Sequence, residues 1–324
     1  MCTAISENQS RHLFGRTLDL ECSYGESIVI TPRGFPISFL HEGESKRGNA
    51  IIGVAHVNKN FPLYYDAINE HGLGIAALNF KGFARYFDAL CDKKSIASFE
   101  LPLWILRGCS NLGEAKEHLS EAVITGDSFD SSLPPTPLHW LIADKTGAIT
   151  VEQTESGLKI YENRFGVLTN APDFLFHQLN VSNYMSLSAK QPSNNICPQT
   201  EVAPYSRGMG AMGLPGDFSS SSRFVRAVFA KSHTRADDTE FGEVGRFFHI
   251  METVSQPLGC AEAEDGKPIS TIYTSCADTE EGIYYFTTYK CRRIRGVKMH
   301  AHELDSCNLI EFSMEKDEDI EILG

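Results

Sequence analysis

Short apolar runs bounded by turn residues predict strands in the first quarter of the chain. Such runs cover 27–32 (SIVITP), 50–57 (AIIGVAHV) and 72–80 (GLGIAALNF). Runs of this length with glycine, proline or charged residues at their ends are typical of strands. The first quarter is therefore expected to be mostly sheet.

A helical pattern follows between residues 98 and 123. In 98–108 (SFELPLWILRG), Leu101, Trp104 and Ile105 recur at helical spacing and share one face. In 111–123 (NLGEAKEHLSEAV), Glu114 and Lys116 take the outward positions. The spacing predicts two helices that follow the first sheet.

Strands return from residue 138 and alternate with helices to the end of the chain. Predicted strands cover 138–144, 148–154, 158–163, 166–170, 269–276, 282–290 and 294–300, and predicted helices cover 172–188, 221–233 and 241–256. Short turns containing glycine join several of the strands, which is typical of antiparallel hairpins. Hairpins in place of regular βαβ alternation predict an α+β protein with layered antiparallel sheets.

The pattern predicts one domain over 1–324, without repeats or low-complexity linkers. Segment 189–216 is the longest stretch without periodicity, and a loop of that length in a compact domain is more often functional than idle. The acidic tail at 315–324 is the one segment expected to be mobile.

Charge and composition exclude several classes of partner. The formal net charge is −13, so the phosphate backbone of nucleic acid and an anionic membrane surface would repel the chain. Apolar runs stay well short of the roughly 20 residues of a membrane span, and the amino terminus lacks the layout of a signal peptide. The nine widely spaced cysteines fit neither a disulfide framework nor a zinc site. We therefore expect a cytoplasmic protein with reduced cysteines.

Cys2 directly follows Met1, and this position suggests a chemical use. If Met1 is removed, Cys2 carries a thiol nucleophile and a free α-amine that can act as its base. The α-amine ordinarily titrates at about 7.7–8.0 and the thiol at about 8.5, so both lie near working pH. By itself, the position is a weak signal, because an inert small residue at a mobile terminus explains it as well.

The segment FGRTLDLE supplies charges that could serve this amine and thiol. Arg16 is far enough from Cys2 for the chain to turn back as a neighbouring strand, and a nearby arginine favours the thiolate. Asp19 offers a carboxylate that could hold the α-amine.

Several motifs of the sequence, in their order along the chain, resemble those of the choloylglycine hydrolase family. They are MCTAIS, FGRTLDLE, YYDAINEHGLGIAALNF, TPLHWLIAD, VLTNAPDF, GLPGDFSSSSRFVR and IYTSCADTEEGIYYFTTY. This family includes bile salt hydrolases and penicillin V acylases, and the resemblance runs nearly from end to end. It implies the four-layer αββα fold of N-terminal nucleophile hydrolases, with two stacked antiparallel sheets. Relatives are commonly tetramers, which implies a homotetramer here.

The resemblance also implies the roles of six residues. Cys2 would be the nucleophile, exposed by removal of Met1 alone, Arg16 would favour the thiolate, and Asp19 would orient the α-amine. The backbone N–H of Asn79 and the side-chain amide of Asn170 would form the oxyanion hole. Arg223 would complete the charged network around the thiol. Ordinary structural roles are the alternative for each.

The resemblance implies hydrolysis of glycine- and taurine-conjugated bile salts through a thioester. Asn79 is typical of bile salt hydrolases, whereas penicillin-type members more often have tyrosine there. Ala171 departs from the polar residue that many relatives have. Candidate walls of an apolar acyl site are Leu18, Leu20, Phe61, Tyr65, Phe129 and Leu133. Arg207, in YSRGMG, could bind the anionic end and favour taurine conjugates, or be a solvated loop residue.

Two alternatives stay open: a sister acylase acting on penicillin V or acyl-homoserine lactones, and a non-catalytic sterol-binding protein. Neither H-E-x-x-H nor G-x-G-x-x-G occurs in the sequence, so no metal or nucleotide cofactor is expected. His139, in LHWL, alternates like a strand residue and is expected to be structural.

Overall fold

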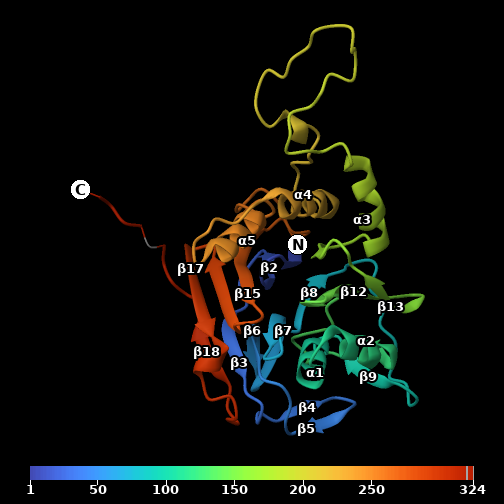
Figure 1. Cartoon of the computed structure of the whole chain (residues 1–324). Helices are drawn as coiled ribbons and strands as arrows, with labels where there is room; N and C mark the ends of the chain where they lie inside the picture. Colours follow the sequence, from blue (N-terminus) through green and yellow to red (C-terminus); the bar gives the residue numbers. More distant parts are fainter. Residues whose placement is uncertain (319, 324) are drawn as a thin grey trace.

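The computed structural model describes residues 1–318 and 320–323, and its strands build two large antiparallel sheets (Figure 1). The first sheet has the order β14 (Val167–Leu168), β1 (Cys2–Asn8), β2 (His12–Leu20), β15 (Ser270–Asp278), β16 (Ile283–Thr288), β17 (Cys291–Lys298). The second has the order β13 (Gly157–Glu162), β12 (Gly147–Thr154), β11 (Leu138–Asp144), β8 (Gly74–Asn79), β7 (Phe61–Asn69), β6 (Ile51–Asn58), β3 (Ser27–Thr31), β18 (Ile310–Ser313).

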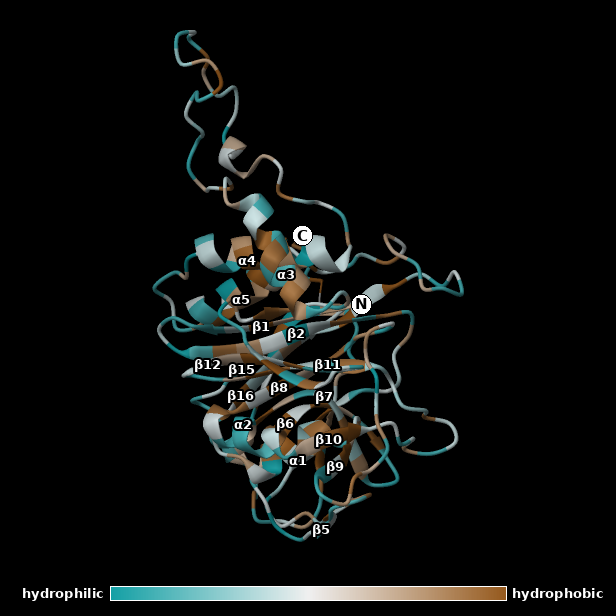
Figure 2. Cartoon of the chain, turned by 90° about the vertical axis from the view of Figure 1, so that its right-hand side faces the viewer, coloured by the Kyte–Doolittle hydropathy of each residue, from teal (hydrophilic) through white to brown (hydrophobic). Residues whose placement is uncertain are grey.

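Helices cover the outer face of each sheet. Helices α1 (Leu101–Gly108) and α2 (Leu112–Ser120) contact the second sheet, and α4 (Ser220–His233) and α5 (Gly242–Glu252) contact the first. Helix α3 (Phe174–Asn180) packs beside α4. Figure 2 shows the resulting order of helices, sheet, sheet and helices. The expected αββα arrangement is confirmed.

Two apolar cores hold these layers together. One lies between the sheets and below α4 and α5, and the other lies between the second sheet and helices α1 and α2. In β6, Ile52 belongs to the first core and its neighbour Ile51 to the second, and both are fully buried. Because successive strand residues face opposite sides, a strand buried on both faces becomes a continuous apolar run.

The structure corrects the predicted elements in several places. The helix predicted at 111–123 ends at Ser120, and β10 (Ala122–Thr125) follows, paired in parallel with β9 (Lys94–Ala97). Val123 and Ile124 are buried there, and such residues pack well in a strand. The helix predicted at 172–188 is shorter: α3 ends at Asn180, and the 3₁₀ helix η1 (Val181–Tyr184) follows. Strand β7 was not predicted.

Other connecting elements are short. Strands β4 (Ile37–Phe39) and β5 (Gly43–Ser45) form a hairpin, and η3 (Met299–Ala301) follows β17. Segment 189–216 contains only η2 (Met209–Ala211) as a described element and projects from the body beyond α4 (Figure 1). The acidic tail includes residues 319 and 324, which lie outside the described residues, so the mobility of the tail stays a prediction. The single-domain organisation also stays a prediction. Among the described helices, none is long and apolar enough to cross a membrane.

Candidate active site

Strand pairing places Cys2 and Arg16 on the same face of the first sheet. Cys2 lies opposite Leu18, and Arg16 lies opposite Ala4. Opposed residues of an antiparallel pair project to one side, and residues two apart on a strand do so as well. The Cys2 thiol and the Arg16 guanidinium therefore both face the second sheet.

Arg16 is fully buried and is held by backbone oxygens. Its Nη1 donates to the carbonyl oxygen of Tyr65 at 3.0 Å and to that of Ala77, and its Nε donates to that of Thr17 at 3.1 Å. Within the described part of the chain, Nη2 is buried without a hydrogen-bond partner. One donor of this buried cation thus remains available for an anion.

Charges around Arg16 keep it protonated. Burial opposes the cation, but Cys2, Tyr273 and Asp66 outweigh burial and raise the pKa of Arg16 above its ordinary value. Asp66 is itself buried and accepts hydrogen bonds from Ser275 Oγ at 2.8 Å and from the hydroxyl of Tyr273 at 2.5 Å. The space between the sheets therefore contains a positive group beside Cys2.

The opposite face of the same strands carries a second polar group. Asp19 is fully buried and accepts from Thr271 Oγ1 at 2.7 Å and from Thr17 Oγ1 at 3.2 Å. Gln256 Nε2 lies 3.4 Å from Asp19 Oδ2. Burial raises the pKa of Asp19, while Arg223 and the amino terminus act in the opposite direction. Asp19 is thus a fixed carboxyl group close to the chain start.

Asn170 joins the start of the chain to α4. Its Oδ1 accepts from the backbone nitrogen of Cys2 at 2.8 Å and from Arg223 Nη2 at 2.7 Å. Arg223 Nη1 also donates to the Cys2 carbonyl and to Thr3 Oγ1. Burial lowers the pKa of Arg223, but Asp19 and Cys2 favour its cation, and arginine stays charged in proteins.

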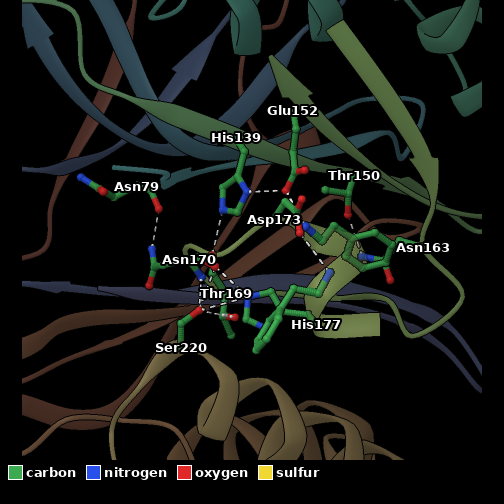
Figure 3. A network of polar contacts seen from close by, with 12 residues as sticks. Asn79, His139, Thr150, Glu152, Asn163, Thr169, Asn170, Asp173, His177 and Ser220 are labelled. Carbon is green, nitrogen blue, oxygen red and sulfur yellow. Dashed lines mark hydrogen bonds and ion pairs between the residues drawn. The ribbon is translucent and has the colours of Figure 1, made fainter. Parts of the chain in front are cut away.

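Asn79 and Asn170 also meet directly. Asn170 Nδ2 donates to the Asn79 carbonyl at 2.9 Å (Figure 3). A side-chain amide has two N–H donors, so the second donor of Asn170 is free to bind another acceptor. The six residues predicted to be catalytic, Cys2, Arg16, Asp19, Asn79, Asn170 and Arg223, thus occupy one region. Cys2, Arg16 and Asp19 lie on β1 and β2, and the other three residues approach these strands from β8, from the segment after β14 and from α4.

Met1 is part of this region in the structure. Its amino group donates to the Asp19 carbonyl at 2.6 Å, and the Asp19 N–H donates to the Met1 carbonyl at 2.9 Å. Met1 therefore extends the pairing of β1 with β2 by one residue. Cys2 is 3% exposed in this form, and its nitrogen belongs to a peptide bond.

The residues predicted to line an acyl site fall into two groups. Leu18 belongs to the core that contains Cys2, and Leu20 and Tyr65 pack against that core. The rings of Phe61 and Phe129 lie 5.6 Å apart. Leu133 accepts a hydrogen bond from the Phe129 N–H through its carbonyl. Phe61 packs against the core between the second sheet and helices α1 and α2, whereas Tyr65, where the register of β7 with β6 shifts, packs against the core that contains Cys2.

Arg207 does not lie with either group. It is exposed in the projecting segment 189–216 (Figure 1). Because this segment projects away from the body, the contact of Arg207 with an anionic substrate stays a prediction.

Sequence reasoning expected a structural role for His139 but missed Ser220 and His177 as supports of Asn170. Ser220 and His177 contact its backbone, and His139 contacts the preceding Thr169 carbonyl. Phe99 was also missed, and its ring lies 5.4 Å from that of Phe129. A serine run at a helix start and isolated buried histidines carry little local signal, because capping and core packing produce the same patterns.

No group of three or more His, Cys, Asp or Glu residues that could hold a metal occurs within the described residues. The polar groups of the region are instead cations, amides and single carboxylates. These groups can hold an anion and move protons at the start of β1, and they do not imply a bound metal ion.

Comparison with known proteins matches the sequence of this chain to a described family. The model of the family "Linear amide C-N hydrolases, choloylglycine hydrolase family" matches residues 2–312. The chain is 44% identical over 314 residues to the bile salt hydrolase/transferase of Lactiplantibacillus plantarum, covering 97% of both chains.

Solved structures give the same result for the fold. A mutant conjugated bile acid hydrolase from Clostridium perfringens superposes with a TM-score of 0.93 and 33% identity, covering 100% of both chains. The penicillin V acylase from Agrobacterium tumefaciens gives a TM-score of 0.76 at 18% identity, covering 97% of this chain and 91% of that one. The latter likeness concerns the fold alone.

Proposed function

This chain belongs to the choloylglycine hydrolase family of linear amide C–N hydrolases, and from that premise we propose that it hydrolyses glycine- and taurine-conjugated bile salts. It is a hydrolase of linear amides with the αββα fold of N-terminal nucleophile hydrolases. Similar proteins are described as bile salt or conjugated bile acid hydrolases, which supports bile salts as the substrate class.

The convergence of Cys2 and Arg223 on Asn170 is the observation that best supports Cys2 as the nucleophile. Asn170 Oδ1 accepts from the Cys2 backbone nitrogen at 2.8 Å and from Arg223 Nη2 at 2.7 Å. The residue that carries the nucleophile, a cation and an amide donor are thereby held together. Arg16, with its free Nη2, faces the same side as the thiol. A positive charge beside a thiol favours the thiolate.

The proposed reaction begins after Met1 is removed. Removal frees the α-amine of Cys2, whose nitrogen is part of a peptide bond while Met1 is present. Asp19 orients the amine, which takes the thiol proton, and the resulting Cys2 thiolate attacks the acyl carbonyl carbon. The oxyanion is bound by the Asn79 N–H and the second Nδ2 hydrogen of Asn170.

Two bond cleavages complete the reaction. The C–N bond breaks as the leaving glycine or taurine nitrogen takes a proton from the α-ammonium of Cys2. Water then attacks the thioester, releasing the bile acid and restoring the thiol. The proton that restores the thiol comes from this water through the α-amine, so this sequence of steps uses no cofactor.

A wide apolar surface is expected for the steroid. The aromatic cluster of Phe61, Phe99 and Phe129, together with Leu133 and the core side of Leu18, Leu20 and Tyr65, supports such a surface. We propose that Arg207 favours taurine conjugates and that the chain forms a homotetramer. Exposed Ile196, Val202 and Tyr205 on segment 189–216 support contacts between copies, and light scattering of the purified protein measures the assembly.

The competing function is that of a sister acylase. Such an enzyme would use the same catalytic groups and differ in the acyl site, so relative rates separate the two. Taurocholate, glycocholate, penicillin V and an acyl-homoserine lactone are compared at equal concentration. Fast release of taurine or glycine supports the proposal, faster cleavage of another substrate contradicts it, and binding of bile salt without release indicates a non-catalytic sterol-binding protein.

A further inference from the structure

Two buried histidines bind two consecutive carbonyl oxygens at the candidate oxyanion donor. His139 Nε2 lies 3.0 Å from the Thr169 carbonyl, and His177 Nε2 lies 2.8 Å from the Asn170 carbonyl (Figure 3). A carbonyl oxygen only accepts hydrogen bonds. Both histidines therefore carry a proton on Nε2 and donate it to the main chain at 169–170.

His139 is fixed on three sides. It lies on β11, and its Nδ1 is 3.1 Å from Glu152 Oε1 on the neighbouring strand β12. Glu152 Oε1 also accepts from the backbone nitrogen of Phe174 at 3.0 Å. The ring stacks on Phe80 with centroids 4.3 Å apart and planes 9° apart. These contacts fix the ring of His139, so its Nε2–H points to the Thr169 carbonyl.

His177 is fixed in a similar way on the opposite side of the chain. It lies on α3, and its ring stacks on Phe224 of α4 at 5.0 Å with planes 16° apart. Burial lowers the pKa of His177 to about 4, so the ring is neutral at neutral pH. With the proton on Nε2, Nδ1 is a buried acceptor that has no partner within the described residues.

Ser220 completes the support of Asn170. Its Oγ accepts from the Asn170 N–H at 2.8 Å and donates to the Asn170 carbonyl at 2.8 Å. Ser220 and Arg223 are three residues apart on α4 and share one face of that helix. One helix turn therefore holds both the main chain and the side chain of Asn170.

We propose that His139, His177 and Ser220 are positioning residues that fix Asn170 so that its free Nδ2 hydrogen points to the oxyanion. The inference rests on the proposed function of Asn170. Oxyanion stabilisation depends on donors placed before the reaction begins, and a shift of about 1 Å can reduce the rate roughly 100-fold. None of the three residues contacts the reacting atoms in this account.

A matched pair of variants separates hydrogen bonding from packing. His177→Phe keeps a ring against Phe224 and removes the donor, whereas His177→Gln keeps an amide donor near the Nε2 position and removes the ring. We expect kcat to fall at least about 10-fold in His177→Phe with little change in KM, and to recover most of that loss in His177→Gln. The inference is overturned if His177→Phe is as active as the wild type, or if kcat is lower in His177→Gln than in His177→Phe.

A milder variant guards against loss of folding. Ser220→Ala removes one hydroxyl from α4, and Ser221→Ala removes the next one, which has no contact with Asn170. A lower kcat is expected for Ser220→Ala only, with the iodoacetamide reactivity of Cys2 unchanged in both. The same kcat in both variants contradicts a positioning role for Ser220.

A structural readout separates this inference from the proposed function. Crystal structures of His177→Phe and His139→Phe are expected to show Asn170 Nδ2 displaced from its 2.9 Å contact with the Asn79 carbonyl. An unmoved Asn170 in both overturns the inference whatever substrate the enzyme uses. Failure of the wild type to cleave bile salts contradicts the proposed function but leaves this readout valid.

Discussion

The Arg223 guanidinium donates to the side-chain oxygen of Asn170 at 2.7 Å, although 53 residues separate them in the chain. This contact leaves the amide nitrogen of Asn170 to donate elsewhere, one hydrogen going to the Asn79 carbonyl. The orientation of the amide is thus set by its oxygen. The proposed oxyanion donor is available because Arg223 and the Cys2 nitrogen occupy that oxygen.

Replacing Asn170 by alanine is expected to lower kcat about 100- to 1,000-fold, because one oxyanion donor is lost. KM should change little, since the donor acts mainly on the charge that develops during the reaction. Steady-state kinetics with the preferred conjugate measures both constants. Asn183→Ala, on the exposed 3₁₀ helix, is the control. Equal losses in kcat and in apparent affinity would contradict a role specific to the transition state.

Arg16→Leu is expected to lower the rate at which iodoacetamide alkylates Cys2 near neutral pH, because a nearby cation favours the thiolate. The rate of iodoacetamide labelling of Cys2 is measured against pH by mass spectrometry. As the control, Arg11→Leu removes a partly exposed cation that directly precedes β2 and pairs with Asp278 on β15. An unchanged labelling rate in Arg16→Leu would show that Arg16 does not act on the thiol.

Acid is expected to destabilise the fold through buried histidines. Burial lowers the pKa of His12 from 6.5 to about 4, and its ring nitrogens lie 2.9 Å from Ser6 Oγ and 2.8 Å from Thr279 Oγ1. The unfolded state therefore binds a proton at a higher pH than the folded state does. This stability is present above about pH 6.5 and is lost progressively as pH falls towards 4, by up to about 3 kcal/mol.

Urea unfolding at pH 7 and pH 5 measures this contribution, with His12→Gln as the variant that does not titrate. The variant should lose less free energy of unfolding between the two pH values than the wild type does. Parallel losses in both proteins would assign the acid sensitivity to other groups, of which His177 is the first candidate.

Arg207→Ala is expected to lower the ratio of taurine to glycine release, because a guanidinium can bind a sulfonate through two hydrogen bonds. Lys190→Ala removes a cation from the same projecting segment and is the matched control. Both ratios are measured with taurocholate and glycocholate in parallel. If Arg207→Ala leaves the ratio at the wild-type value, the proposed preference is wrong.

Local pattern sufficed for most of the strands and for an α+β protein with antiparallel sheets, whereas the order of the four layers came from the family resemblance. It failed at Ala122 and Val123, which the helix predicted at 111–123 included and which begin strand β10 (Ala122–Thr125). That strand is stabilised by pairing with Lys94–Ala97, a partner distant in the sequence. Periodicity reports which face of a segment is buried, but not which distant segment covers it.

The candidate site was predictable to a different extent for different residues. Cys2, Arg16 and Asp19 lie on two adjacent strands, so their approach follows from a single turn. Asn170 and Arg223 were predicted only through family resemblance, since no spacing relates them to Cys2. His177 and Ser220 could not be predicted, because their role depends on how α3 and α4 pack over residue 170.

The most direct measurement is the release of taurine and glycine from taurocholate and glycocholate by the wild type and by Cys2→Ser, with removal of Met1 confirmed in both by intact mass. The account predicts rapid release by the wild type, loss of release in the variant, and a transient thioester mass on Cys2. Undiminished release by Cys2→Ser, or no release by a wild-type chain that lacks Met1, would contradict the account.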